Sequence, residues 1–387
     1  MKKLILLILI LSLCGCNYKE LDKIAITLGC GIEKIDNEYQ ITIQIADTQK
    51  QGNSNTSSSS IKFKNYSNKD KTIHEAFRGV LSKLPKKVYS GHLQVLIIDE
   101  SIAHSGLEDI MDFFFREVEL RNDFYVFVSR NNTPSEILNV LTQVYPINSI
   151  GIRNLLENNN KYLSGSILSS FENLIDEYIS PTKEIILPSI TVIGKNGDKK
   201  ENLETSNPNS LLLVNETSIF KDNKLIFYLD KNQTIYYNLI KNKLKNTIIN
   251  VECSKDKYIT LEIINNKTDI KINKNTPIID INIKSKVNLT SSMCNYDIST
   301  NKGIKQIEYL TSLEIEKNIN DLINLSKEYK TDIFYFKDLY YKKNNKYYNK
   351  ITDYENFYQN LKINLSVNVN IFEKGNSLKV IDNEKNK

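Results

Sequence analysis

The chain has 387 residues, of which 40% are hydrophobic and 25% are charged, values typical of globular proteins. This length predicts more than one domain, and the composition excludes both a wholly disordered chain and a polytopic membrane protein. The 51 basic and 46 acidic residues leave a formal charge of +5 that is spread along the sequence, which excludes a cationic arm for nucleic acid.

The first sixteen residues have the pattern of a bacterial lipoprotein signal. Lys2 and Lys3 precede an apolar run over 4–13, which is shorter than the roughly 18 residues that a spanning helix needs. Cys16 follows at once, in a Leu-Cys-Gly-Cys sequence that resembles a lipobox. We therefore expect cleavage after Gly15, and S-diacylglycerol and N-acyl groups on Cys16 that attach the chain stably to a membrane. An ordinary signal peptide with incidental cysteines fits the placement of Cys16 less well.

Strand and helix patterns alternate in the next part of the chain, which we assign to an N-terminal α/β domain over 16–195. Strands are expected at 24–32, 39–45, 61–66, 93–98, 123–129 and 184–193, and helices at 72–84, 102–115, 134 onward, 150–157 and 167–178. Right-handed crossovers predict that the strands near Leu96 and Val126 are parallel. A polar stretch over 51–60 is expected to be a mobile loop. The strand near Leu96 lacks a glycine-rich phosphate loop after it, so the sequence does not favour nucleotide binding.

A polar, aperiodic segment over 196–210 is interpreted as a linker to a C-terminal domain over 211–375, which a polar tail over 376–387 follows. The expected elements of this domain are a hairpin of 211–220 and 225–229, a helix at 233–240, strands at 248–253, 258–264, 269–273, 278–289 and 361–371, and an amphipathic helix at 303–330. The sequence therefore predicts an α+β (mixed α/β), multidomain protein with mixed sheets covered by helices and a long amphipathic helix in the C-terminal part.

The three histidines do not form a catalytic or metal-binding pattern. His74 and Glu75 begin like a zinc-protease helix, but Arg78 stands where the second histidine ligand belongs. Neither His92 nor His104 lies near a serine or cysteine nucleophile signature, so capping or partly buried roles are favoured. No metal and no cofactor other than the covalent lipid is expected.

The densest charge cluster lies between a predicted helix and a predicted strand. Its carboxylates could serve acid/base chemistry, but the alternation of Arg116, Glu119 and Arg121 favours a structural ion-pair network. Beyond the signal and the anchor, three cysteines remain. Among them one bridge between Cys253 and Cys294 is an option that the spacing neither favours nor excludes.

Several short motifs, in this order, resemble the Ger(x)C spore germination lipoproteins, the C subunits of germinant receptors. They cover almost the whole chain after the lipobox: Leu21–Ala25, Gly29–Lys34, Tyr39–Ile45, Leu84–His92, Phe115–Arg121, Glu216–Leu225, Thr331–Phe334 and the last strand. Two departures stand out. Tyr335 and Lys337 replace glycines that are common in the family, which questions the backbone conformation of that turn, and Cys30 replaces a small or apolar residue.

The resemblance implies a three-domain α/β structure, with the part after 210 divided near 248. It also implies a non-enzymatic subunit at the outer face of the spore inner membrane or cell membrane, which assembles with A-type and B-type membrane subunits and helps nutrients trigger germination. Whether this subunit binds the nutrient stays open. The tyrosine- and lysine-rich stretch 335–348 could suggest stacking with nucleic acid, but a packed surface or a contact with a membrane partner suits an exported protein better. A solute-binding lipoprotein of an uptake system is the alternative, and an anchored hydrolase lacks a nucleophile or metal set.

Overall fold

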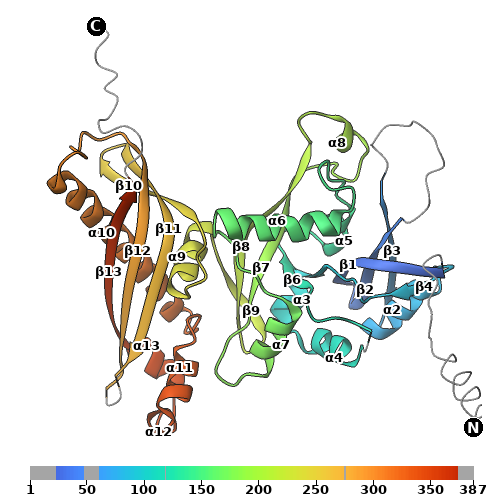
Figure 1. Cartoon of the computed structure of the whole chain (residues 1–387). Helices are drawn as coiled ribbons and strands as arrows, with labels where there is room; N and C mark the ends of the chain where they lie inside the picture. The colour runs from blue at the N-terminus through green and yellow to red at the C-terminus, as the bar shows by residue number, and fades with distance from the viewer. Residues whose placement is uncertain (1–22, 48–60, 118, 274–275, 374–387) are drawn as a thin grey trace, which may run out of the picture.

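The computed structural model describes residues 23–47, 61–117, 119–273 and 276–373. Within them the chain forms two β-sheets of unequal size, which lie at opposite ends of the molecule and are packed against helices (Figure 1). This is the mixed α/β, multidomain architecture that the sequence predicts. Four predicted features lie outside the described residues: the signal 1–15, Cys16, the loop 51–60 and the tail 376–387.

The larger sheet has nine strands in the described part of the chain, in the order β3-β2-β1-β5-β6-β7-β8-β9, with β4 paired to the start of β1. These strands are β1 (Ile24–Ile35), β2 (Glu38–Ala46), β3 (Phe63–Asp70), β4 (Lys87–Tyr89), β5 (Val95–Ile98), β6 (Tyr125–Ser129), β7 (Ile186–Gly194), β8 (Ser210–Lys221) and β9 (Lys224–Leu229). The centre, β1-β5-β6-β7, is parallel, whereas β2 and β3 at one edge and β8 and β9 at the other are antiparallel.

The parallel centre confirms the crossover prediction, because Leu96 pairs with Val126 in parallel register. All four side chains of β5 are buried, as expected for a strand with both faces covered. Alternate side chains of β5 point to opposite faces of the sheet, so they belong to two separate hydrophobic cores. Leu96 and Ile98 pack with α2, α3, α4 and α7, whereas Val95 and Ile97 pack with α5 and α6 on the other face. These helices are α2 (Ile73–Leu81), α3 (Glu100–Ser105), α4 (Glu108–Arg116), α5 (Pro134–Asn139), α6 (Asn148–Tyr162) and α7 (Phe171–Ile179).

Two predicted elements differ in extent. The single helix expected over 102–115 is two helices, because Gly106 adopts a φ of +130° that no helix continues through. The strand expected over 61–66 is β3, which continues to Asp70 although its second half is polar. An edge strand pairs through its backbone and needs no buried side chain on either face, so hydrophobic alternation underestimates its length.

The segment 196–210, predicted to be a linker between domains, instead connects two neighbouring strands of one sheet. Gly194 of β7 lies opposite Ser210 of β8, and both strands belong to the larger sheet. The connection contains the short helix α8 (Glu201–Glu204), whose Asn202 bonds the carbonyl oxygens of Leu141 and Ser210. Polar residues with glycine and proline suit a long connection within a sheet as well as a linker, so composition could not distinguish the two.

The smaller sheet has the order β10-β11-β12-β13, in which β12 and β13 are parallel and the other pairs antiparallel. Its strands are β10 (Thr247–Ser254), β11 (Lys257–Ile272), β12 (Ile278–Ser292) and β13 (Lys362–Glu373). The two strands expected at 258–264 and 269–273 are one strand, β11, with an irregular register between Ile263 and Asn265.

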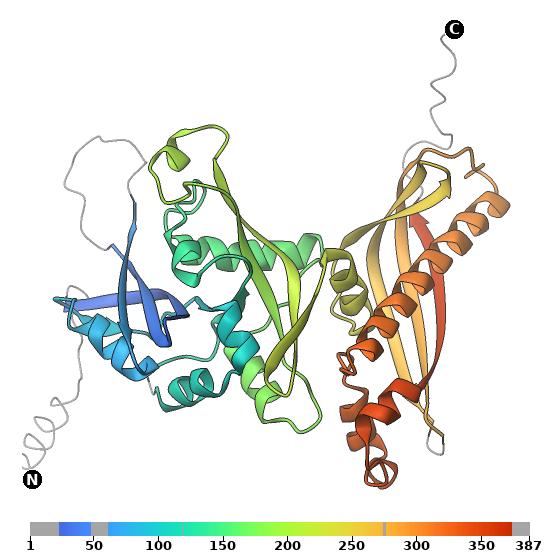
Figure 2. The same ribbon diagram turned by 180° about the vertical axis from the view of Figure 1, so that it is seen from behind.

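Helices α9 (Lys231–Ile240) and α10 (Asn301–Glu328) cover one face of the smaller sheet, and Figure 2 shows α10 lying along it. The predicted amphipathic helix is thereby confirmed, since Ile307, Ile315 and Ile319 form its buried stripe. Three short helices precede β13: α11 (Phe336–Lys343), α12 (Asn345–Tyr348) and α13 (Tyr354–Asn360). Among the described residues no helix is long and apolar enough to cross a membrane.

Candidate functional site

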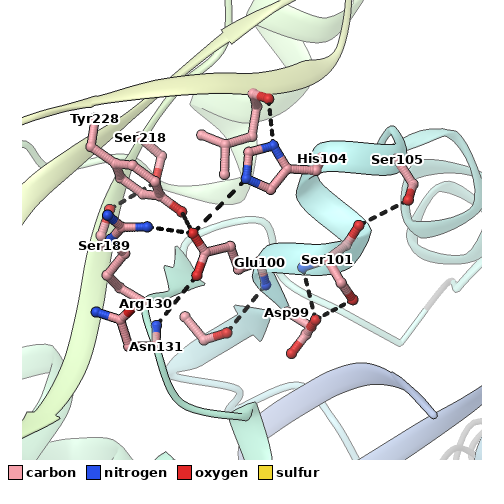
Figure 3. Close-up of polar contacts among 12 residues, drawn as sticks. Asp99, Glu100, Ser101, His104, Ser105, Arg130, Asn131, Ser189, Ser218 and Tyr228 are labelled. Atoms are coloured by element: carbon pink, nitrogen blue, oxygen red, sulfur yellow. Dashed lines mark hydrogen bonds and ion pairs between the residues drawn. The ribbon is translucent and has the colours of Figure 1, made fainter.

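A polar cluster joins the ends of the parallel strands β5 and β6 to the β8–β9 hairpin (Figure 3). Glu100 begins α3 directly after β5, and Arg130 directly follows β6. Arg130 Nη1 donates to Glu100 Oε1 over 2.5 Å, and Tyr228 Oη of β9 donates to the same oxygen over 2.7 Å. The backbone N–H of Asn131 donates to Glu100 Oε2 over 3.3 Å. Both carboxylate oxygens of Glu100 are therefore engaged.

The electrostatics of this cluster favour an ionised, structural carboxylate. Burial acts to raise the pKa of Glu100, but the hydrogen bonds from Tyr228, Asn131 and Arg130 outweigh burial and hold it below its usual range. The Arg130 guanidinium lies 4.0 Å from the centre of the Tyr228 ring. Nδ1 of His104 is 2.8 Å from the Leu225 carbonyl oxygen of β9, which adds a further contact between α3 and the hairpin.

A second polar junction joins α7 to the segment that follows α10, and so connects the two sheets. Tyr335 Oη donates to Glu177 Oε1 over 2.8 Å, and the backbone N–H of Ile186 donates to the other oxygen over 3.1 Å. Thr182 Oγ1 donates to Asp338 Oδ1 over 2.9 Å close by. Burial raises the pKa of Glu177 to about 7, because these hydrogen bonds and nearby lysines offset desolvation only in part.

Tyr335 stands in a turn where the sequence resemblance leads us to expect glycine. Its backbone is left-handed, with φ 62° and ψ 39°, a conformation that costs a non-glycine residue roughly 1 kcal/mol or more. The side chain offsets this cost, because its hydroxyl bonds Glu177 and the Lys241 ammonium lies 4.0 Å from the ring centre. The turn thus keeps the conformation that glycine would adopt, although the residue differs.

Buried charges gather around this second junction. Asp332 accepts hydrogen bonds from the Lys337 N–H over 2.6 Å and from Tyr354 Oη over 2.9 Å, and burial raises its pKa. Lys241 Nζ donates to the Phe334 carbonyl over 3.0 Å, and burial lowers its pKa to about 8. This part of the structure therefore holds several groups whose ionisation is coupled to packing.

Segments that carried the family resemblance meet at a third place, a polar cleft of about 340 Å³. It lies between α2, the chain around β4 and the residues after α4, and β4 pairs with the first residues of β1. Its lining includes His74, Phe77, Arg78 and Leu81 from α2, Lys86, Lys87, Val88 and Ser90 around β4, and Glu117 and Glu119 after α4. The motifs 84–92 and 115–121, distant in sequence, are thus neighbours.

The predicted ion-pair group forms its ion pairs with residues outside the group. Its members are Arg116, Glu119 and Arg121. Arg116 pairs with Asp112 at 2.8 Å, Arg121 with Asp123 at 2.9 Å, and Glu119 with Lys87 at 3.4 Å. Sequence reasoning placed the partners within the group. A side chain at the end of a helix, however, has an acidic residue four positions earlier within its reach, as Arg116 does.

The histidines occupy separate places. His74 packs edge-on against Phe113 and His92 edge-on against Tyr89, with ring centres 5.6 and 5.7 Å apart. Across the described ranges, no three His, Cys, Asp or Glu side chains are grouped so as to hold a metal ion.

The remaining cysteines differ in state. Cys253 and Cys294 form a disulfide, the pairing that the spacing left open. Cys30 is a free, buried thiol, and burial raises its pKa to about 12, so it stays protonated.

Sequence reasoning missed both polar junctions because each joins residues more than 100 positions apart. A partial signal existed for the first one. Glu100 and Arg130 directly follow two strands predicted to be parallel, and such strands end at the same edge of a sheet.

Comparisons with known proteins match both parts of the chain. Residues 17–192 match the family described as spore germination protein N-terminal domain, and residues 215–375 match the one described as spore germination B3/GerAC like, C-terminal. The chain belongs to this spore germination family. The resemblance drawn from the motifs is thereby confirmed. In both junctions the bonded side chains come from the two different family segments, since Glu100 and Glu177 lie in the first and Tyr228 and Tyr335 in the second.

Relatives in the family align over most of their length. Spore germination protein KC of Bacillus subtilis (strain 168) is 23% identical over 365 residues, which cover 90% of this chain and 89% of that protein. Spore germination protein B3 of the same strain is 25% identical over 362 residues, with 90% of each covered. The crystal structure of the GerBC protein superimposes with a TM-score of 0.53 at 17% identity, covering 89% of this chain and 97% of that one. This likeness shows that the fold is shared.

Proposed function

We propose that this protein is a non-enzymatic, lipid-anchored subunit of a nutrient germinant receptor, held at the outer face of the spore inner membrane. The observation that carries the proposal is the match of both segments of the chain to spore germination proteins. The lipobox at Cys16 would supply the anchor, with the acyl groups in the bilayer and the described residues beside it.

Such a protein would function within a complex that also contains an A-type and a B-type membrane subunit. The two junctions support this view, because in each of them a tyrosine of the second family segment donates a hydrogen bond to a glutamate of the first. Such contacts fix the relative position of two parts of a chain and so present one defined surface to other subunits.

The alternative, a solute-binding lipoprotein, predicts two similar lobes around a ligand cleft. In the described residues one sheet has nine strands with a parallel centre, and the other has four strands that are mostly antiparallel. The geometry therefore favours the receptor subunit over this alternative.

Replacement of the lipobox cysteine tests the proposal. Cys16→Ala is expected to abolish incorporation of labelled palmitate and to impair nutrient-triggered germination, because the thiol is the acceptor of the lipid. Cys14→Ala, the matched control, makes the same change in the segment that cleavage removes, and is expected to leave both unchanged. Labelling of the immunoprecipitated protein and the fall in absorbance of a spore suspension are the measurements. Unchanged palmitate labelling of Cys16→Ala would contradict the anchor.

A further inference from the structure

We propose that the polar cleft between α2, β4 and the residues after α4 binds the phosphoethanolamine headgroup of a membrane phospholipid. The proposal rests on the lipid anchor of the proposed function for the position of the bilayer. It adds a second, non-covalent contact with the same membrane, which would orient the protein on the surface.

The cleft lies close to the N-terminal end of the described chain. Ile24–Ile26 at the start of β1 pair with Lys87–Tyr89 of β4, so the cleft lies beside the point where the described chain begins. In both views α2 and β4 lie at the end of the molecule where β1 starts, far from the smaller sheet (Figures 1 and 2). Seven residues lead from Cys16 to Lys23, and an extended chain spans at most about 25 Å over that length. The cleft is therefore within reach of headgroups around an acylated Cys16.

The lining of the cleft carries charges of both signs. Lys87 is neutralised by Glu119, but three other charged residues of the lining, Arg78, Lys86 and Glu117, have no ion-pair partner in the part of the chain that the structure describes. Two unpaired cations are suited to the oxygens of a phosphodiester. The unpaired carboxylate of Glu117 is suited to an ammonium group.

The mixed charge of the lining narrows the choice of headgroup. A purely anionic headgroup would satisfy Arg78 and Lys86 but would be repelled by Glu117. The trimethylammonium group of choline has no N–H to donate to that carboxylate, whereas the ammonium of ethanolamine has three. The volume of about 340 Å³ falls within the range of small-ligand sites, and Phe77 and Leu81 add apolar surface for the glycerol end.

Vesicle binding by the chain from residue 17 onward tests the proposal. This chain cannot carry the lipid on Cys16 but keeps every residue of the described fold, so the result does not depend on acylation. We expect it to bind vesicles of phosphatidylethanolamine in phosphatidylcholine at least tenfold more tightly than vesicles of phosphatidylcholine alone. Arg78→Ala/Lys86→Ala is expected to weaken this binding at least tenfold, because both charge-assisted hydrogen bonds to the phosphodiester would be lost. Co-sedimentation measures both.

Two variants give the controls. Lys267→Ala/Lys284→Ala removes the same charge from two exposed lysines that face each other across β11 and β12 in the smaller sheet, and should bind as the unmodified chain does. Glu117→Gln should weaken binding to phosphatidylethanolamine but not to phosphatidylglycerol, because only the former carries an ammonium. Equal losses in both double variants, equal binding to all lipids, or equal affinity for soluble glycerophosphoethanolamine without vesicles would each overturn the proposal.

Discussion

Tyr335 illustrates at the level of one residue how this protein joins its two family segments. The backbone of Tyr335 is strained, yet its hydroxyl is the donor that Glu177 needs in a buried place. Glycine at this position would relieve the backbone and leave the Glu177 carboxylate without that donor, and an unsatisfied buried acceptor costs about 1–3 kcal/mol. The hydrogen bond from the tyrosine hydroxyl therefore explains why tyrosine is present at a position where the left-handed backbone alone would favour glycine.

Glu177→Gln is expected to flatten the dependence of stability on pH. Burial, opposed by the hydrogen bonds from Tyr335 and Ile186, raises the pKa of Glu177 from 4.5 to about 7. A raised folded-state pKa means that protonation favours the folded state, so this contribution is complete below about pH 4.5 and is lost as the pH rises through 7. The free energy of unfolding in urea should therefore fall less between pH 5 and pH 8 in the variant.

The control for this prediction is Glu172→Gln, which changes an exposed carboxyl of the same helix. Some pH dependence should remain in Glu177→Gln, because burial also raises the pKa of Glu184 to about 7. The charged and titratable groups that interact with Glu177 are Lys183 before β7, Tyr237, Lys241 and Lys243 in and after α9, and Tyr335 after α10. Asp332 and Asp338 belong to the same cluster through Lys241. An unchanged pH profile would contradict the buried state of the carboxyl.

At the scale of elements, hydrophobic periodicity predicted the structure well wherever one face or both faces of an element are buried. The stripe of α10 and the buried strand β5 are examples. Periodicity was less accurate where backbone conformation determines the end of a helix, as at the break before α4. It was also less accurate where strand pairing needs no buried side chain, as in the second half of β3. The β7–β8 connection shows a third limit, because long loops and linkers share their composition.

The disulfide also acts at the scale of elements, because it links β10 to the residues after β12 in the smaller sheet. Cys253 of β10 and Cys294 after β12 lie 41 positions apart, and a crosslink over that separation destabilises the unfolded chain by roughly 4 kcal/mol. Dithiothreitol is therefore expected to lower the unfolding temperature followed by circular dichroism. The variant Cys253→Ser/Cys294→Ser should unfold at a similarly reduced temperature whether or not the reductant is present. A wild-type unfolding temperature unaffected by complete reduction would contradict a stabilising role.

For the whole molecule, the sequence predicted the family and the mixed α/β architecture, but not how the two family segments meet, and lipidation of Cys16 stays a prediction. The lipobox and the motifs are local in sequence, so they can be read directly. The bonds of Tyr228 to Glu100 and of Tyr335 to Glu177 join residues that only folding brings together. The cleft was predictable only in part. The sequence identified the motifs that line it, but not that they lie next to one another in the folded chain.

The central claim, that this chain is a subunit through which nutrients trigger germination, is tested most directly in spores that lack it. Spores of a strain in which the gene is deleted should no longer show the fall in absorbance on addition of at least one nutrient. Complementation with the full chain should restore that fall. We expect the loss to be confined to nutrients that act through the receptor to which this chain belongs. Spores that lack the chain and yet germinate at the wild-type rate with every nutrient to which the wild type responds would contradict it.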